Sequence, residues 1–85
     1  MRLLLISNST NAGESYLEYP MPYIKRFLGE EKLKCVFIPY AGVSINFDDY
    51  TKKVQDRFSE IGFNIESVHN MEDPVEGIMS AEAIV

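Results

Sequence analysis

The sequence of 85 residues predicts an α/β fold, a three-layer, doubly wound and mostly parallel sheet with helices on both faces. Three observations support this prediction. Short apolar runs alternate with segments of helical spacing, in the order strand, helix, strand, helix, strand, helix, strand. The apolar runs are continuous, which is typical of strands that are buried on both faces. The length leaves room for a single domain, in which right-handed crossovers would place helices on both faces of the sheet.

The first predicted strand is the apolar run Leu3–Ile6, and the polar loop Ser7–Gly13 follows its carboxyl end. Helical spacing then begins, with apolar residues at Leu17, Met21, Ile24 and Leu28. Pro20 and Pro22 interrupt this pattern, so we expect the main helix to start at about Met21. Gly29 closes the helix, because glycine is favoured just after a helix end.

The second predicted strand is Cys35–Ile38, and the loop Pro39–Ser44 follows it. The next helix has the clearest pattern, with one apolar stripe at Phe47, Tyr50, Val54, Phe58 and Ile61. Asn46 can cap the first turn of this helix, and Asp49 stands three residues further on, at the spacing of a capping box. Gly62 ends the helix.

A third strand is predicted at Phe63–Val68 and a fourth at Ala83–Val85. Between them a short helix begins at Pro74, with Asp73 as its cap. A parallel strand normally leads into a loop and another helix, so we expect residues 1–85 to be one N-terminal subdomain of a longer domain. For the strand order we favour 3-2-1-4, which places the first and fourth strands side by side, and the order 2-1-3-4 stays open.

The charges and the cysteine count exclude several classes of protein. The net charge is -5, from 13 Asp and Glu against 8 Lys and Arg, which opposes binding to nucleic acid phosphates. The single cysteine excludes a disulfide framework and any multi-cysteine metal site. No apolar run approaches the ~20 residues that cross a bilayer, and Leu3–Ile6 is too short for a signal-peptide core. We therefore expect a cytoplasmic protein that binds neither nucleic acid nor a membrane.

Ligands of open α/β sheets bind beyond the carboxyl ends of the strands. Two loops of small and polar residues are predicted there, Ser7–Gly13 and Pro39–Ser44. Such residues let backbone N–H groups approach a ligand, and Ser9 and Thr10 add hydroxyl groups. The alternative is that the loops contain only the residues that turns favour. The phosphate-binding patterns GxGxxG and GxxxxGK[ST] are absent from the sequence.

No catalytic group can be assembled from the residues alone. Cys35 begins the second strand among apolar neighbours, and we expect a buried, unreactive thiol. His69 follows the third strand, where we expect a solvated loop histidine. Asp48 and Asp49 fall in the first turn of a helix, where carboxylates favour the helix dipole. There is no GxSxG elbow to expose a serine nucleophile, and no residue cluster has metal-ligand spacing.

Two segments resemble one known family when they are taken together. Residues 3–10 read LLLISNST and residues 36–43 read VFIPYAGV. This pair is similar to the opening of the peptidase E family, the α-aspartyl dipeptidases among the serine peptidases. Asp49–Thr51 and Asp73–Pro74 also resemble the family pattern. The resemblance runs over all 85 residues in order, but it covers only the first part of a family member.

The resemblance implies a fold related to the class I glutamine amidotransferases. The implied activity is hydrolysis of dipeptides with N-terminal aspartate (Asp-Xaa), a small peptide substrate, without a metal or organic cofactor. The family's serine elbow, histidine and acidic partner would follow Val85, so no catalytic residue is assigned here and the 85 residues alone are expected to be inactive. The resemblance does assign the loop residues that border the site: Asn8, Ser9, Thr10, Ala41, Gly42 and Val43.

Two alternatives stay open for the function. One is a cyanophycinase-like peptidase with another aspartyl-peptide substrate, and the other is a stand-alone flavodoxin-like module that binds FMN or another ligand. A chain with this pattern would also leave apolar surface and a sheet edge uncovered. Such surfaces favour association, so we expect the 85-residue chain to self-associate.

Overall fold

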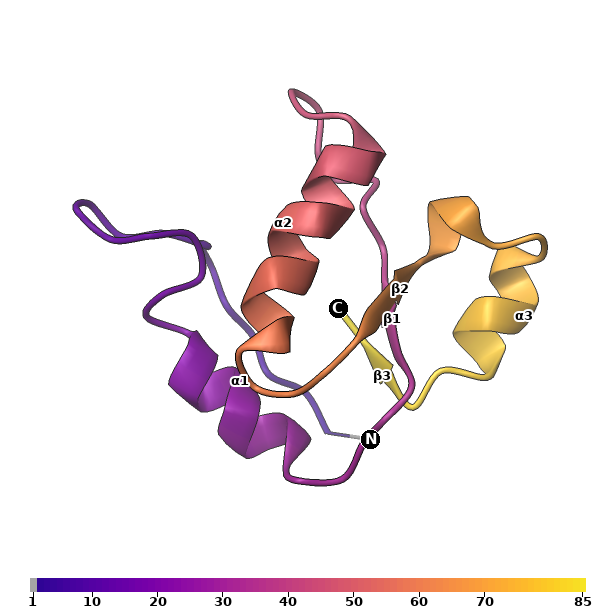
Figure 1. Cartoon of the computed structure of the whole chain (residues 1–85), viewed down its shortest axis with the longest axis horizontal. Coiled ribbons are helices and arrows are strands. Elements are labelled where there is room, and N and C mark those ends of the chain that lie inside the picture. Colours follow the sequence, from indigo (N-terminus) through magenta and orange to yellow (C-terminus); the bar gives the residue numbers. More distant parts are fainter. Residues whose placement is uncertain (1) are drawn as a thin grey trace. The chain divides into compact units, whose positions relative to one another are not determined.

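The computed structural model describes residues 2–85 and contains helices together with one parallel sheet (Figure 1). The chain divides into two compact units, the first ending at Glu31 and the second spanning Lys32–Val85. Within residues 2–85, no helix combines the length and the apolar character that crossing a bilayer requires.

The first unit contains helix α1, Met21–Leu28. Met21, Ile24 and Leu28 are buried, at the spacing that the sequence predicted. Pro22 lies in the first turn, where the missing N–H has no helical partner to lose. Gly29 ends the helix with a φ of 78°, and its N–H donates to the carbonyl of Lys25 at 3.0 Å. The start at Met21 and the end at Gly29 are therefore confirmed.

The second unit contains a three-stranded parallel sheet in the order β2-β1-β3. The strands are β1 (Cys35–Phe37), β2 (Ile65–Ser67) and β3 (Ala83–Ile84). The central strand is β1, and every one of its residues is buried. Beyond β3, the Val85 N–H donates to the Val36 carbonyl at 2.8 Å, and the Ile38 N–H donates to the Val85 carbonyl at 2.9 Å.

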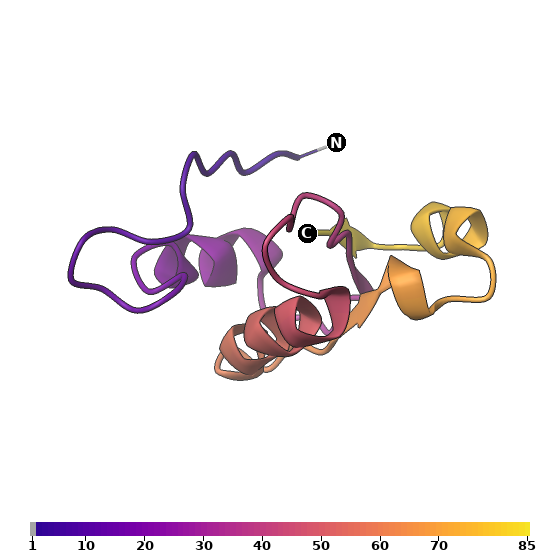
Figure 2. The same ribbon diagram turned by 90° about the horizontal axis from the view of Figure 1, so that it is seen from above.

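Helices α2, Phe47–Ser59, and α3, Pro74–Met79, lie on opposite sides of this sheet (Figures 1 and 2). Helix α2 is capped by Asn46, whose Oδ1 accepts from the Asp49 N–H at 2.8 Å, as the sequence predicted. Helix α3 is capped by Asp73, and a short 3-10 helix η1, Val68–Asn70, precedes it. Parallel strands with helices on both sides confirm the predicted α/β fold class.

Helix α2 is also fastened to the start of β2. The Gln55 side chain donates to the Phe63 carbonyl at 3.1 Å and accepts from the Ile65 N–H at 2.7 Å. Val54 and Phe58 are buried on the same helix. This amide thus bonds to backbone groups at the first residue of β2 and just before it.

The predicted first strand at Leu3–Ile6 is wrong for this structure. These residues have no regular secondary structure, and the side chains of Leu3 and Leu5 are 71% and 86% exposed. A strand forms only when its N–H and C=O groups pair with a neighbour, and an apolar pattern does not specify that neighbour. Within the sheet, the edge of β1 opposite β2 is paired with β3.

The predicted strand orders also need correction. The favoured order, 3-2-1-4, separates the second and fourth predicted strands, whereas these two pair directly as β1 and β3. The order 2-1-3-4 would pair the third and fourth predicted strands, whereas β2 and β3 lie on opposite edges of β1. Both orders included a first strand that does not form.

Candidate functional site

The loop after β1 contains three of the predicted site-bordering residues. It begins with a turn in which the Gly42 N–H donates to the Pro39 carbonyl at 3.0 Å. Ala41 is exposed, and the Val43 side chain is 96% exposed. Val43 is thus an apolar side chain without cover in the loop that follows the carboxyl end of β1.

Gly42 lies directly against an aromatic ring. A Cβ atom at this position would lie 2.6 Å from Cδ2 of Tyr50, which is closer than packed carbon atoms approach. The Tyr50 ring is held in turn by an edge contact with Phe37, with ring centroids 5.0 Å apart. The absence of a side chain at Gly42 therefore lets the loop backbone pack on α2.

A second aromatic contact holds the start of the loop. Tyr40 packs edge-on against Phe47, the first residue of α2, with centroids 5.3 Å apart. Phe47 also packs against the ring of His69, with centroids 5.6 Å apart. Edge-to-face contacts of this kind add to the stabilisation that comes from buried area alone.

His69 forms hydrogen bonds through both ring nitrogens. Nδ1 lies 2.5 Å from Oγ of Ser67, and Nε2 lies 2.7 Å from Oδ1 of Asp48. A carboxylate can only accept, so Nε2 carries the hydrogen, and Nδ1 of the neutral ring accepts from the serine hydroxyl. The expectation of a solvated loop histidine is thus wrong, because the His69 side chain is only 15% exposed and has a partner at each nitrogen.

Ser67, His69 and Asp48 are the residue types of a nucleophilic triad, but this arrangement cannot present a nucleophile. Ser67 is 2% exposed and ends a regular strand, whereas a nucleophilic serine needs an exposed position on a sharp turn. The array therefore joins the end of β2 to the start of α2. Sequence reasoning missed it, and the available signal was a histidine just after a strand together with an aspartate in a helix's first turn.

The other predicted loop lies in the first unit and is organised by Asn8. Its side-chain amide donates to the Thr10 carbonyl at 3.0 Å and to Oδ1 of Asn11 at 3.1 Å. The Tyr19 hydroxyl lies 2.5 Å from the Asn8 carbonyl oxygen and 2.6 Å from its Oδ1. Ser9 and Thr10 are exposed, with their hydroxyls 3.4 Å apart. These contacts leave two adjacent hydroxyl groups at the surface of an ordered loop.

Leu17, which bonds to this loop, has an uncommon backbone conformation. Its φ is 57°, in the left-handed region that favours glycine, and its N–H donates to the Ser9 carbonyl at 2.8 Å. The side chain is 9% exposed, so burial offsets the backbone strain. Asn8, Ser9 and Thr10 thus lie in the first unit, and Ala41, Gly42 and Val43 in the second. That both loops border one site stays a prediction.

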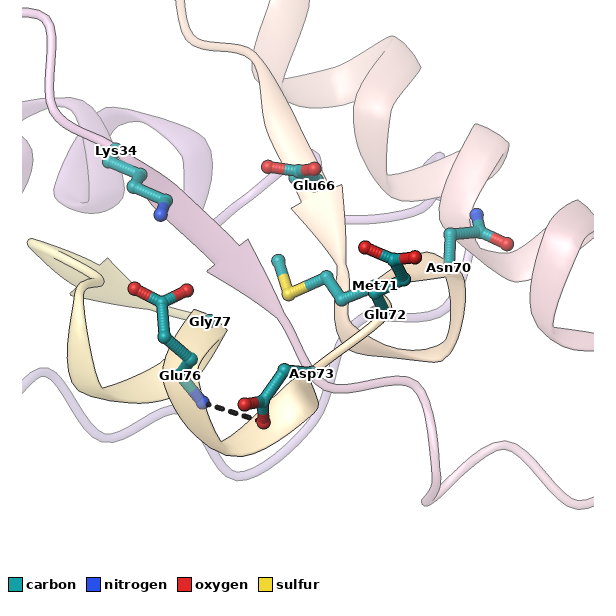
Figure 3. A pocket seen from close by; sticks show the side chains of 8 residues that line it. All are labelled: Lys34, Glu66, Asn70, Met71, Glu72, Asp73, Glu76 and Gly77. Carbon is teal, nitrogen blue, oxygen red and sulfur yellow. Dashed lines mark hydrogen bonds between the residues drawn. The ribbon is translucent and has the colours of Figure 1, made fainter.

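A pocket of about 440 Å³ lies elsewhere in the second unit, and no residue of either predicted loop lines it. Figure 3 shows its lining residues, which are Lys34, Glu66, Asn70, Met71, Glu72, Asp73, Glu76 and Gly77. Four of them are acidic and one is basic. One Asp73 oxygen accepts from the Glu76 N–H at 3.2 Å, and the Lys34 ammonium donates to the Ser80 hydroxyl at 2.5 Å. Two of the charged groups are therefore engaged in structural hydrogen bonds.

Cys35 has the character that the sequence predicted. It is 1% exposed, and burial, with a smaller contribution from Glu82, raises the pKa of its thiol above the ordinary value. A protonated, buried thiol is a poor nucleophile and a poor metal ligand. Within residues 2–85, no three His, Cys, Asp or Glu side chains are grouped so as to hold a metal ion.

A parallel sheet with helices on both sides, and loops beyond the carboxyl ends of its strands, defines a doubly wound α/β domain. A sequence model described as Peptidase family S51 matches residues 3–85. The chain belongs to this peptidase family, which confirms the resemblance seen in the sequence.

Relatives with curated names match the chain over almost all of its length. Peptidase E of Nostoc sp. is 46% identical over 84 residues, which are 99% of this chain and 35% of that protein. Peptidase E of Salmonella heidelberg is 40% identical over 85 residues, which are 100% of this chain and 37% of that protein. The chain therefore spans little more than a third of the length of these relatives.

Proposed function

We propose that these 85 residues form the N-terminal part of a serine-type dipeptidase that removes N-terminal aspartate from Asp-Xaa dipeptides. The observation that carries the proposal is the match to relatives named Peptidase E over 99% and 100% of the chain. The membership of peptidase family S51 supports it. In the same proposal, the 85-residue chain is inactive by itself.

The structure supports this inactivity through the state of each candidate nucleophile. The hydroxyl of Ser67 is buried and bonded to His69, and the thiol of Cys35 is buried with a raised pKa. The hydroxyls of Ser9 and Thr10 are exposed, and they are bonded to each other rather than to a histidine or a carboxylate. A hydroxyl without an adjacent base is a weak nucleophile at neutral pH.

The proposed reaction is acyl transfer. A serine hydroxyl supplied by the rest of such an enzyme attacks the peptide carbonyl, a histidine takes the serine proton and passes it to the leaving amine, and backbone N–H groups hold the oxyanion. The contribution of this chain is the two loops that border the substrate. Neither Ser7–Gly13 nor Pro39–Ser44 contains Lys or Arg. The charged donors for the substrate's aspartate carboxylate therefore also belong to the rest of the enzyme.

The proposal is tested with a chimaera in which residues 1–85 replace the matching N-terminal part of Nostoc Peptidase E. Hydrolysis of Asp-Leu is followed for the chimaera, for the intact Nostoc protein and for the 85-residue chain. We expect turnover by the first two and none by the third, and Leu-Leu serves as the control for aspartate preference.

Two outcomes would contradict the proposal. Hydrolysis of Asp-Leu by the 85-residue chain would show that a nucleophile was overlooked, with Ser9 the first to replace by alanine. A folded chimaera that does not hydrolyse Asp-Leu, while the intact Nostoc protein does, would show that these residues do not support this reaction.

A further inference from the structure

We infer that His69 is the positioning residue of the loop Pro39–Ser44, which it holds through the first turn of α2. The imidazole joins two elements that are far apart in the sequence. Asp48 belongs to the first turn of α2, Ser67 is the last residue of β2, and both bond to the same ring. The ring thus fixes where α2 begins relative to the carboxyl end of the sheet.

This restraint passes to the loop through Phe47. The Phe47 ring packs edge-on against His69 on one side and against Tyr40 on the other, at interplanar angles of 67° and 69°. Tyr40 is the residue before Ala41, so the entry to the loop depends on where Phe47 is held. Phe47 is half-buried, and His69 is the ring that supports it from the sheet side.

The exit of the loop depends on the same turn of α2. Asn46 caps the helix through the Asp49 N–H, and Tyr50 supports Gly42 from the next turn. Residues from the cap and the first turns of α2 therefore contact the loop or His69. A ring that holds the start of this helix also holds the loop that packs on it.

When the ring is neutral, this bonding pattern fits one tautomer of His69. Asp48 accepts from Nε2–H, and Ser67 donates its hydroxyl hydrogen to Nδ1. A ring held only by packing can also carry its hydrogen on Nε2, so the positioning role requires this tautomer but is not demonstrated by it. The rescue by Asp48→Asn described below is the readout that a space-filling role would not produce.

The relevance of this loop to a peptide site rests on the proposed function, whereas the positioning itself does not. The test therefore uses the 85-residue chain and reads the loop directly, by amide hydrogen exchange at Gly42 and Asp49 and by the ¹⁵N shifts of the His69 ring. A negative Asp-Leu assay would therefore not affect the exchange and ¹⁵N results. Negative exchange and ¹⁵N results would likewise not affect the Asp-Leu assay.

The main variant is His69→Phe, which keeps a ring beside Phe47 and removes both hydrogen bonds. We expect exchange at Gly42 and Asp49 to accelerate by at least about three- to tenfold, the factor that corresponds to the net contribution of one hydrogen bond, because two such bonds are lost. Asp48→Ala removes only the bond to Nε2, and from its exposed position it should accelerate exchange by about three- to tenfold. Asp48→Asn keeps an acceptor for Nε2–H and should stay within about twofold of the unchanged chain.

Gln55→Ala is the matched control, because Gln55 ties the same helix to the start of β2 rather than to its end. We expect it to change exchange at Gly42 no more than elsewhere in the second unit. The inference is overturned if Asp48→Ala leaves Gly42 and Asp49 unchanged, if the ring carries its hydrogen on Nδ1, or if the His69 and Gln55 variants accelerate all amides equally. If His69→Phe does not fold, the two Asp48 variants decide.

Discussion

The carboxylate of Glu82 accepts a hydrogen bond from the backbone N–H of Lys34 at 3.0 Å, and the Lys34 carbonyl accepts from the backbone N–H of Glu82 at 3.0 Å. The Ala83 N–H also donates to the Lys34 carbonyl, at 3.1 Å. These bonds stand immediately before the parallel pair of β1 and β3. Because β3 is only two residues long, they lengthen a pairing that would otherwise contain few hydrogen bonds.

Replacing Glu82 by alanine should lower the free energy of unfolding by about 0.5–1 kcal/mol, because the Lys34 N–H loses its acceptor at an exposed position. Glu82→Gln keeps a side-chain oxygen at the same reach and should cost less. Urea unfolding at pH 7 measures both variants. Equal losses for alanine and glutamine would show that charge, rather than this hydrogen bond, is the source of the effect.

A methyl group at Gly42 should destabilise the chain. Gly42→Ala places Cβ inside contact distance of the Tyr50 ring, and that ring is held by Phe37. We expect the free energy of unfolding to fall by about 1–3 kcal/mol, as for other overpacked positions. The control is the same substitution in a Tyr50→Ala background, where the ring is gone and the methyl group has space. A cost that persists in that background would locate the strain in the backbone instead.

The thiol of Cys35 should make stability depend on alkaline pH. Burial, and secondarily Glu82, raise its pKa above the ordinary 9.0, so the folded chain holds the thiol proton more tightly than the unfolded chain does. The resulting stabilisation is fully present below the ordinary thiol pKa and is lost as the pH rises through the folded value. Urea unfolding at pH 8 and pH 10 should show a larger decline for the unchanged chain than for Cys35→Ala. Parallel declines would contradict the prediction.

Self-association stays a prediction, and the exposed apolar segment Leu3–Ile6 can be used to test it. The Leu3 and Leu5 side chains are 71% and 86% exposed in an apolar run. We expect the double variant Leu3→Lys, Leu5→Lys to shift the chain towards monomer in light scattering at micromolar concentration. Val43→Lys is the control, since Val43 is 96% exposed but stands alone in its loop. An unchanged chain that is already monomeric would contradict self-association.

The elements that the sequence predicted correctly are those with a local cause. Helix α2 has its cap in Asn46 and its buried side chains in Val54 and Phe58, all set by spacing along the chain. Helix α1 starts and ends where the prolines and Gly29 place it. Such signals act over a few residues and need no knowledge of the rest of the fold.

The errors concern relations between distant residues. The run Leu3–Ile6 is as apolar as a buried strand, but apolarity does not specify which strand it pairs with, and β3 is the strand that pairs with β1. The bonds of His69 to Ser67 and Asp48 depend on how the β2 end meets the α2 start. Gly42 likewise gives no sign in the sequence that Tyr50 lies against it.

The central position of β1 has a consequence for the order in which the second unit folds. Its pairing with β2 joins residues 35 and 65, and its pairing with β3 joins residues 35 and 83. The entropic cost of closing a loop grows with its length, so the nearer partner is the easier one to find. Helix α2, β1 and β2 should therefore assemble as an early nucleus. Strand β3, short and distant along the chain, then docks on the completed edge and is the first element to detach when the unit unfolds.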